Sequence, residues 1–141
     1  MRITSSAPTR IDLAGGTLDI WPLYLFHDDA QTVNVAISRR AECVLTPHTQ
    51  GRLQLSAADI GASIEVNTYA ELENNEANPL LSRIARYFSA TGMVISTRSD
   101  SPVGAGLAGS SALNVALCAA FQRWNRLPIE TEALMLSLIH I

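Results

Sequence analysis

The sequence contains no lysine, so arginine supplies all 10 of its basic residues. These arginines stand singly apart from Arg39-Arg40, and the formal net charge at pH 7 is −3. Without a basic cluster, we expect neither nucleic acid nor an anionic membrane surface to be a partner. The lack of lysine also excludes the Walker A phosphate loop, in which a lysine follows the last glycine.

Cysteine and histidine are scarce as well, at 2 and 3 residues, and they are scattered. Cys43 and Cys118 match no metal or redox spacing, so a zinc site is not expected. Cys118 lies within an apolar helical pattern, which predicts a buried free thiol. No apolar run approaches the roughly 18 residues that span a membrane, and the N-terminus has no signal-peptide pattern. We therefore expect no membrane partner and a cytoplasmic location.

Apolar residues are plentiful, at 48% of the 141 residues, and they follow the periods of strands and helices. Residues 1–15 are predicted to be short extended segments that lead into a turn at Gly15-Gly16. Alternating patterns predict four further strands, at Thr32–Ser38, Ala41–Pro47, Arg52–Ala57 and Ala62–Asn67. Because these strands are closely spaced and joined by polar turns, we expect an antiparallel meander.

The second half of the chain has helical patterns. Asn78 and Pro79 predict a helix N-terminus, and a strand at Met93–Thr97 precedes a second helix at Ser110–Trp124. The apolar residues expected on one face of this second helix are Leu113, Leu117, Ala120 or Phe121, and Trp124. A third helix is predicted from Ile129. These elements indicate an α+β fold with two layers, in which the helices pack on one side of the sheet.

The last six residues, LSLIHI (136–141), read as the in-frame translation of a common sequencing-library adapter. We therefore expect them to be a non-native tail and place the domain at residues 1–135.

The loop SPVGAGLAGSSA (101–112) lies between the predicted strand and the second helix. Backbone N–H groups and the helix dipole bind phosphate in such a place, and glycines let the backbone approach a ligand closely. Ser110 and Ser111 put hydroxyls in the first helical turn, where they can bond a phosphate oxygen or Mg²⁺. The loop therefore predicts a phosphate site.

The loop has two other interpretations. In the simpler one it is a flexible loop whose helix is capped by Ser110. In the other, Gly104-x-Gly106-x-x-Gly109 is a dinucleotide fingerprint. The context disfavours the fingerprint, because residues 99–102 separate the strand from Gly104 and no strand precedes Glu130.

Taken whole, the loop resembles the second signature motif of the GHMP kinases, Pro-x-x-x-Gly-Leu-x-x-Ser-Ser-Ala. The resemblance implies that the loop wraps the phosphates of ATP and that Ser110 helps to hold Mg²⁺. The residues implied to contact the phosphates are Pro102, Gly104, Ala105, Gly106, Leu107, Ala108, Gly109, Ser110, Ser111 and Ala112. One departure is that Ala108-Gly109 replaces the commoner Gly-Ser or Ser-Ser pair.

APTRIDLAGGTLD (7–19) is similar to the first signature of the same family. The resemblance implies that Arg10 lies beside the transferred phosphoryl group and that Asp19 binds substrate hydroxyls. A fixed cation would stabilise charge spreading over the phosphoryl oxygens. Thr17 is a further substrate-binding candidate, and Asp12 either contacts the substrate or pairs with Arg10.

The resemblance implies the N-terminal domain of a GHMP kinase, a ribosomal-protein-like β-α-β fold, that transfers the γ-phosphate of ATP to a sugar hydroxyl. The Ala-Gly-Gly turn followed by Thr and Asp is closest to the heptose-phosphate and fucose kinase branch. The family's catalytic Asp, metal-binding Glu and third glycine motif find no match after Ala112. We therefore expect a truncated, inactive fragment without the C-terminal domain. The alternatives are a non-catalytic nucleotide- or sugar-binding relative and, with less support, a dinucleotide-dependent oxidoreductase.

Overall fold

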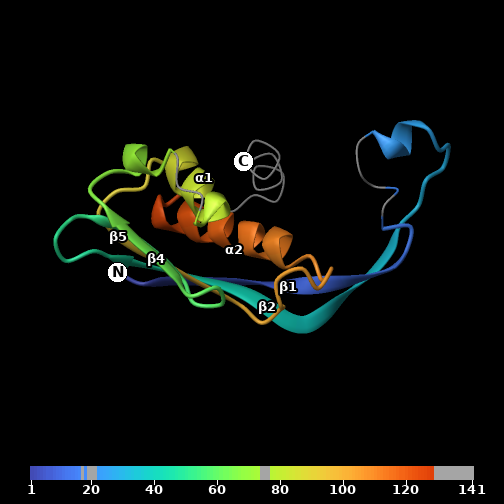
Figure 1. Cartoon of the computed structure of the whole chain (residues 1–141), viewed down its shortest axis with the longest axis horizontal. Helices are drawn as coiled ribbons and strands as arrows, with labels where there is room; N and C mark the ends of the chain where they lie inside the picture. The colour runs from blue at the N-terminus through green and yellow to red at the C-terminus, as the bar shows by residue number, and fades with distance from the viewer. Residues whose placement is uncertain (17, 19–21, 74–76, 129–141) are drawn as a thin grey trace.

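The computed structural model describes residues 1–16, 18, 22–73 and 77–128, which form a five-stranded sheet with two α-helices on one face (Figure 1). The strand order is β1-β2-β5-β3-β4. The predicted α+β class with helices on one side is confirmed. In chain order the elements are β1 Ile3–Ala14, η1 Leu23–Leu25, β2 Val33–Pro47, β3 Leu53–Ala57, β4 Ala62–Val66, η2 Tyr69–Leu72, α1 Pro79–Tyr87, β5 Met93–Ser99 and α2 Gly109–Trp124, where η marks a 3-10 turn.

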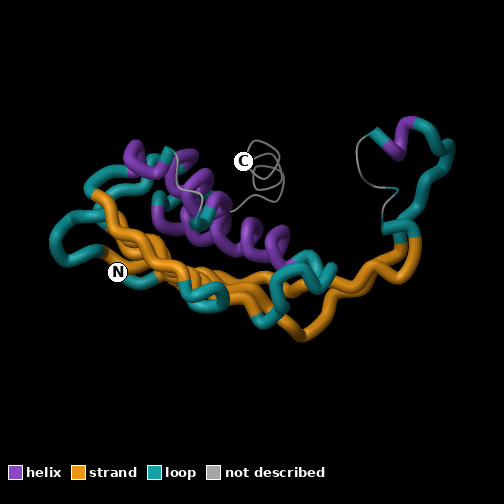
Figure 2. The backbone as a smooth tube through the Cα atoms, viewed as in Figure 1, coloured by secondary structure: helices purple, strands orange, loops and turns teal. Residues whose placement is uncertain are grey.

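The two longest strands, β1 and β2, form an antiparallel pair that continues past the start of α2 (Figure 2). The short segments expected in residues 1–15 are thus one strand, and the two strands expected in residues 32–47 are also one. A bulge interrupts the pairing: Pro8 lies opposite Arg40, whereas Arg10 lies opposite Ala36. The hydroxyl of Thr9 donates to the carbonyl of Arg39 at 3.1 Å across this bulge. A bulge increases local twist and redirects the next side chain, here Arg10.

The predicted meander is wrong. β3 pairs with β4 in antiparallel fashion but with β5 in parallel, and β5 separates β3 from β2. The chain after β4 crosses the sheet face through α1 before it returns as β5, which is the connection that a parallel pair requires. This arrangement places the end of β5 beside the turn between β3 and β4.

The core lies between the sheet and the helices. Alternate residues of three strands are buried there: Ala41, Cys43, Leu45, Leu53, Leu55, Ala57, Met93, Ile95 and Thr97. α2 covers them with Leu117, Ala120 and Phe121, as its pattern predicts, while Leu113 and Trp124 are half-buried. Each fully buried large side chain contributes about 1.5–3 kcal/mol. This packing fixes α2, and with it the loop that precedes α2.

α1 begins where the sequence predicts. Asn78 caps it, because the Asn78 side chain accepts a hydrogen bond from the Leu81 amide at 3.1 Å, and Pro79 is its first residue. The ring of Phe88 stacks on Phe121 of α2 with a centroid distance of 4.6 Å. The cap thus fixes the first turn of α1, and the stack ties the end of α1 to the end of α2. The third helix, expected from Ile129, lies outside the described residues.

Candidate functional site

The loop between β5 and α2 turns through two glycines in the left-handed region, Gly104 (φ +78°) and Gly106 (φ +70°). The Ala105 amide donates to the Pro102 carbonyl at 3.2 Å and closes the first turn. A Cβ on either glycine would meet nothing within 4 Å. Glycine is therefore needed here for its backbone conformation, which costs an L-residue roughly 1–2 kcal/mol.

The start of α2 has no side-chain cap. Its N-cap residue is Ala108, which has a φ of +55°, and Ser110 lies inside the helix with an exposed side chain. The interpretation in which Ser110 caps the helix is therefore wrong. The first amides of a helix have no acceptor within the helix, and they carry the positive end of its dipole. The N-terminus of α2 thus offers donors to an anion.

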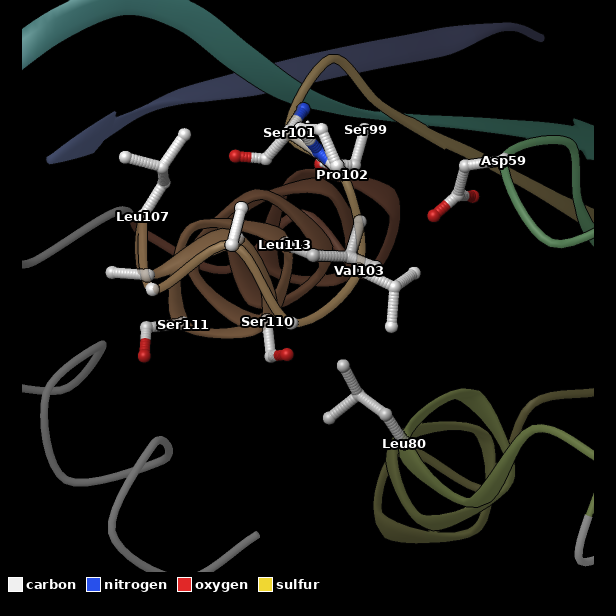
Figure 3. A pocket seen from close by; sticks show the side chains of 15 residues that line it. Asp59, Leu80, Ser99, Ser101, Pro102, Val103, Leu107, Ser110, Ser111 and Leu113 are labelled. Atoms are coloured by element: carbon white, nitrogen blue, oxygen red, sulfur yellow. Dashed lines mark hydrogen bonds between the residues drawn. The ribbon is translucent and has the colours of Figure 1, made fainter.

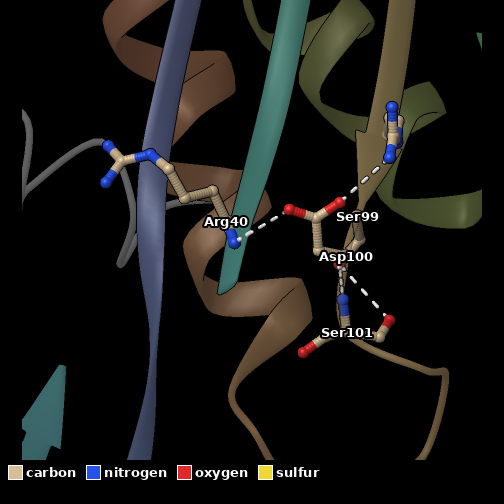
Figure 4. A network of polar contacts seen from close by, with 5 residues as sticks. Arg40, Ser99, Asp100 and Ser101 are labelled. Atoms are coloured by element: carbon tan, nitrogen blue, oxygen red, sulfur yellow. Dashed lines mark hydrogen bonds and ion pairs between the residues drawn. The ribbon is translucent and has the colours of Figure 1, made fainter. Parts of the chain in front are cut away.

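The base of the loop is tied to the sheet through Asp100 (Figure 4). The Asp100 amide donates to the Arg40 carbonyl at 2.9 Å. Its carboxylate accepts from the Arg40 amide at 3.4 Å and from Arg98 Nη2 at 3.3 Å. The two serines that flank Asp100 are also bonded to each other: the Ser101 amide donates to Ser99 Oγ at 3.2 Å. These bonds fix where the loop leaves β5.

Ser101 supplies a polar atom that the described residues leave unpaired. Ser101 is only 6% exposed, and its Oγ has no hydrogen-bond partner in the described part of the chain. A buried hydroxyl without a partner costs about 1–3 kcal/mol. A Cβ on Gly109 would approach Ser101 Cβ to 3.2 Å, so a glycine at this position lets α2 begin close beside Ser101.

A cavity of about 290 Å³ lies over this loop and the first turn of α2. Figure 3 shows Asp59 and Leu80 facing the loop across the opening; Asp59 comes from the turn between β3 and β4, and Leu80 from α1. Val103 and Leu113 add apolar surface. The cavity therefore has a wall of glycines and hydroxyls and, facing it, an apolar wall with one carboxylate.

Arg10 connects the first motif to this loop. Its amide donates to the Leu107 carbonyl at 3.2 Å, so β1 lies directly against the loop. Its Nε donates to Asp12 Oδ1 at 3.0 Å, and the two side chains are 40% and 30% exposed. The structure thus brings Arg10 to the expected phosphate loop and shows the pairing that the sequence left open for Asp12.

The glycine turn that the sequence predicts after β1 is present. Gly15 has a φ of +71°, and its carbonyl accepts from the Leu18 amide at 2.8 Å. A Cβ on Gly15 would lie 2.1 Å from the carbonyl oxygen of Gln31. Thr17 and Asp19 lie outside the described residues.

Asp59 and Leu80 were not predicted to belong to the site. Each lies far from both motifs in sequence, and the parallel pairing of β3 with β5 is what brings the turn of Asp59 to the loop. A signal was present in the turn AADIG (57–61) between two predicted strands, but the strand order was needed to use it.

None of the helices in the described part of the chain has the length and apolar character of a membrane span.

Residues 75–140 match the family of GHMP kinases, N-terminal domain. The chain is similar to the D-glycero-alpha-D-manno-heptose 7-phosphate kinase of Campylobacter jejuni, with 32% identity over 139 residues, 90% of this chain and 39% of that protein. Its structure resembles that of a D-glycero-D-manno-heptose 1-phosphate kinase from Bacteroides thetaiotaomicron, with a TM-score of 0.79, 27% identity, and coverage of 98% of this chain and 46% of that one.

A mevalonate kinase from Methanococcus jannaschii has the same fold, with a TM-score of 0.72 at 15% identity over 95% of this chain and 44% of that one. The chain thus spans less than half the length of the relatives that it matches.

Proposed function

We propose that this chain, whose residues 75–140 match the N-terminal domain of the GHMP kinases, belongs to that family. Its glycine loop then binds the phosphates of ATP for transfer of the γ-phosphate to a sugar hydroxyl. The observation that carries the proposal is the cavity over the start of α2. There, an uncapped helix N-terminus and two left-handed glycines line one space, and Ser101, whose buried hydroxyl has no partner among the described residues, is one of the other lining residues. Backbone donors of this kind bind phosphate.

The role assigned to Arg10 is to stabilise negative charge on the phosphoryl group that is transferred. Its backbone lies against the loop at Leu107, and its guanidinium is anchored on Asp12. In phosphoryl transfer the protein acts mainly by positioning groups and by stabilising charge on the equatorial oxygens. A guanidinium that is bonded to Asp12, on a strand whose backbone is bonded to the loop, would supply that charge with little reorganisation.

Mg²⁺ is the second proposed cofactor, with Ser110 as its ligand from this chain. The Ser110 side chain is exposed in the first turn of α2, and its oxygen is a hard donor that suits Mg²⁺. Bound with ATP, Mg²⁺ neutralises phosphate charge. Because α2 is packed on the sheet, Ser110 would hold its place relative to the loop.

The proposed acceptor is a heptose phosphate, fucose or a related sugar. The support is that two relatives are named as heptose-phosphate kinases. Asp19 and Thr17 stay assigned to the sugar hydroxyls, since a carboxylate accepts two hydroxyl hydrogen bonds well.

The proposed location is the cytoplasm, which is where a kinase that uses ATP is expected.

The catalytic Asp is proposed to lie outside this chain, so we expect the chain to bind nucleotide without transferring phosphate. A relative that binds nucleotide or sugar without catalysis would share the described site, so the activity of the intact protein separates these two functions. The dinucleotide alternative has no support from the fold, because the sheet is mixed rather than the parallel sheet of that class.

Calorimetric titration of the purified chain with ATP, with and without Mg²⁺, and with NAD tests the proposal. We expect ATP to bind more tightly than NAD. In Ser110→Ala the gain in affinity due to Mg²⁺ should fall by about tenfold, because one ligand of a positioned metal is lost. Ser63→Ala, an exposed serine on β4, is the matched control. Preference for NAD, or an unchanged Mg²⁺ effect in Ser110→Ala, would contradict the respective assignment.

A further inference from the structure

Asp12 lies between the arginine of the first motif and the glycine turn that follows it. Arg10 Nε donates to Asp12 Oδ1 at 3.0 Å. On its other side Asp12 packs on Gly16: a Cβ placed there would lie 2.8 Å from Asp12 Cβ and 3.1 Å from Asp12 Oδ2. Carbon atoms in contact are about 3.5–4.0 Å apart. Any side chain at residue 16 would therefore displace Asp12.

Gly16 is not required for its backbone conformation. Unlike Gly15, it is not among the residues with positive φ, so an L-residue is allowed there. What requires a glycine is the space that Asp12 occupies. Gly16 thus leaves space for the Asp12 carboxylate, whereas Gly15 provides the positive φ that the turn requires.

The backbone and the side chain of Arg10 are held by different contacts. The Arg10 amide is bonded to Leu107, and the bulge just before it sets the direction of the side chain. An arginine side chain nevertheless has several rotatable bonds, which cost up to about 2 kcal/mol in entropy when they are ordered. The bond from Arg10 Nε to Asp12 Oδ1 restricts the arrangements that the guanidinium adopts.

We propose that Asp12 is a positioning residue: it holds the guanidinium of Arg10 in one orientation beside the glycine loop, and Gly16 gives it the room to do so. This inference rests on the proposed function, because it takes Arg10 to serve the phosphate. Of the two roles considered for Asp12, it takes the pairing with Arg10, in which Oδ1 accepts from Arg10 Nε.

A positioning role for Asp12 and simple charge repulsion predict opposite changes in polyphosphate affinity when Asp12 is removed. A carboxylate near a polyphosphate repels it, so by charge alone the loss of Asp12 should strengthen binding. If Asp12 acts through Arg10, its loss should weaken binding, and it should do so only while Arg10 is present. Two residues that act as a unit give non-additive effects in a double-mutant cycle.

The test is a titration of inorganic tripolyphosphate and of ATP with the chain and four variants. We expect Arg10→Ala to lower affinity about tenfold, as for loss of a charge-assisted contact. Asp12→Ala should lower it about two- to fivefold, the fold-change typical of an exposed ion pair. The double variant should bind no more weakly than Arg10→Ala alone. Tighter binding by Asp12→Ala, or additive losses, would overturn the proposal.

Glu42→Gln is the matched control for net charge. Glu42 is exposed on β2, six residues beyond Ala36, which lies opposite Arg10. Six residues of strand span roughly 20 Å, and at physiological ionic strength a charge is screened over about 8 Å. Glu42→Gln should therefore leave tripolyphosphate affinity unchanged, whereas Asp12→Ala lowers it.

A second measurement separates this proposal from the proposed function. NMR exchange of the Arg10 Nε–H with water reports the bond to Asp12 whether or not a nucleotide binds. We expect exchange to be about fivefold faster in Asp12→Ala and in Gly16→Ala than in the unchanged chain, with Asp12→Asn between them. If tripolyphosphate and ATP do not bind but exchange changes as expected, the proposed function fails and the positioning by Asp12 stands. Unchanged exchange in both variants would overturn the positioning.

Discussion

The backbone amide of Arg10 and the carbonyl of Leu107 share a hydrogen bond of 3.2 Å. This bond joins the strand of the first motif to the glycine loop of the second. Two motifs that lie near opposite ends of the described chain therefore meet through main-chain atoms, and their spacing does not depend on flexible side chains. The backbone of β1 thus supports the glycine loop, which lines the proposed phosphate site.

Ala108 offers a simple test of the loop geometry. It adopts φ +55° without being a glycine, an arrangement that costs an L-residue roughly 1–2 kcal/mol. We expect Ala108→Gly to stabilise the chain by about 1 kcal/mol and to raise its melting temperature by about 3–5 °C. Ala105→Gly is the control, because Ala105 lies in the same loop and is not among the residues with positive φ. That change should be neutral or destabilising; equal gains in the two variants would contradict the geometry.

Gly15 and Gly51 form a matched pair that separates backbone strain from steric contact. Their φ values are +71° and +72°, but a Cβ on Gly51 would meet nothing within 4 Å, whereas one on Gly15 would lie 2.1 Å from the Gln31 carbonyl oxygen. We expect Gly51→Ala to cost about 1 kcal/mol in the free energy of unfolding. Gly15→Ala should cost about 2–4 kcal/mol, because overpacking adds to the strain. Urea denaturation measures both, and equal losses would show that residue 31 moves away freely.

The cap of α1 should be measurable in the same way. Asn78 accepts a hydrogen bond from the Leu81 amide, and Leu80 in that turn lines the cavity. Asn78→Ala should cost about 1 kcal/mol of stability. It should also weaken ATP binding slightly, because the turn that carries Leu80 loosens. Asn67→Ala, in an exposed connection, serves as the control and should change neither quantity.

The two buried thiols should make the free energy of unfolding fall at alkaline pH. Burial raises the pKa of Cys43 to about 12, with the neighbouring Cys118 as a second cause, and burial raises the pKa of Cys118 to about 11. The ordinary pKa of a cysteine thiol is 9.0. Just above pH 9, therefore, these thiols ionise in the unfolded chain but stay protonated in the folded one. The thiols therefore contribute stability that is fully present below pH 9 and is lost as the pH rises toward the folded values.

Urea titrations at pH 7, 9 and 10 would measure this loss. Each thiol should contribute a decline of up to about 1.4 kcal/mol per pH unit above pH 9. A Cys43→Ala/Cys118→Ala variant, though less stable overall, should show a flatter dependence over the same range. The same slope in both proteins would assign the alkaline loss to other groups.

Local patterns in the sequence predicted the elements that depend on neighbouring residues. The strand at Met93, the cap at Asn78 and the buried face of α2 follow from periodicity and from capping chemistry, which act over a few positions. The place of the loop between a strand and a helix was predicted for the same reason. The sequence thus supplied the elements around the site.

What the sequence did not predict depends on pairing at a distance. The parallel contact of β3 with β5 leaves no local pattern, because an alternating strand accepts either direction of partner. Asp59 reaches the cavity only through that contact. The left-handed Ala108 was missed for a different reason, since alanine carries no signal for positive φ.

β5 is the only strand that touches both hairpins of the described sheet, since it lies between β2 and β3. During synthesis β1–β2 and β3–β4 leave the ribosome first, and each pairs strands that are consecutive in the chain. The sheet is completed only when β5 arrives, and the glycine loop follows it directly. The proposed phosphate site and the finished sheet should therefore appear in one step, so that nucleotide bound at the loop would protect even β4, at the far edge, from proteases.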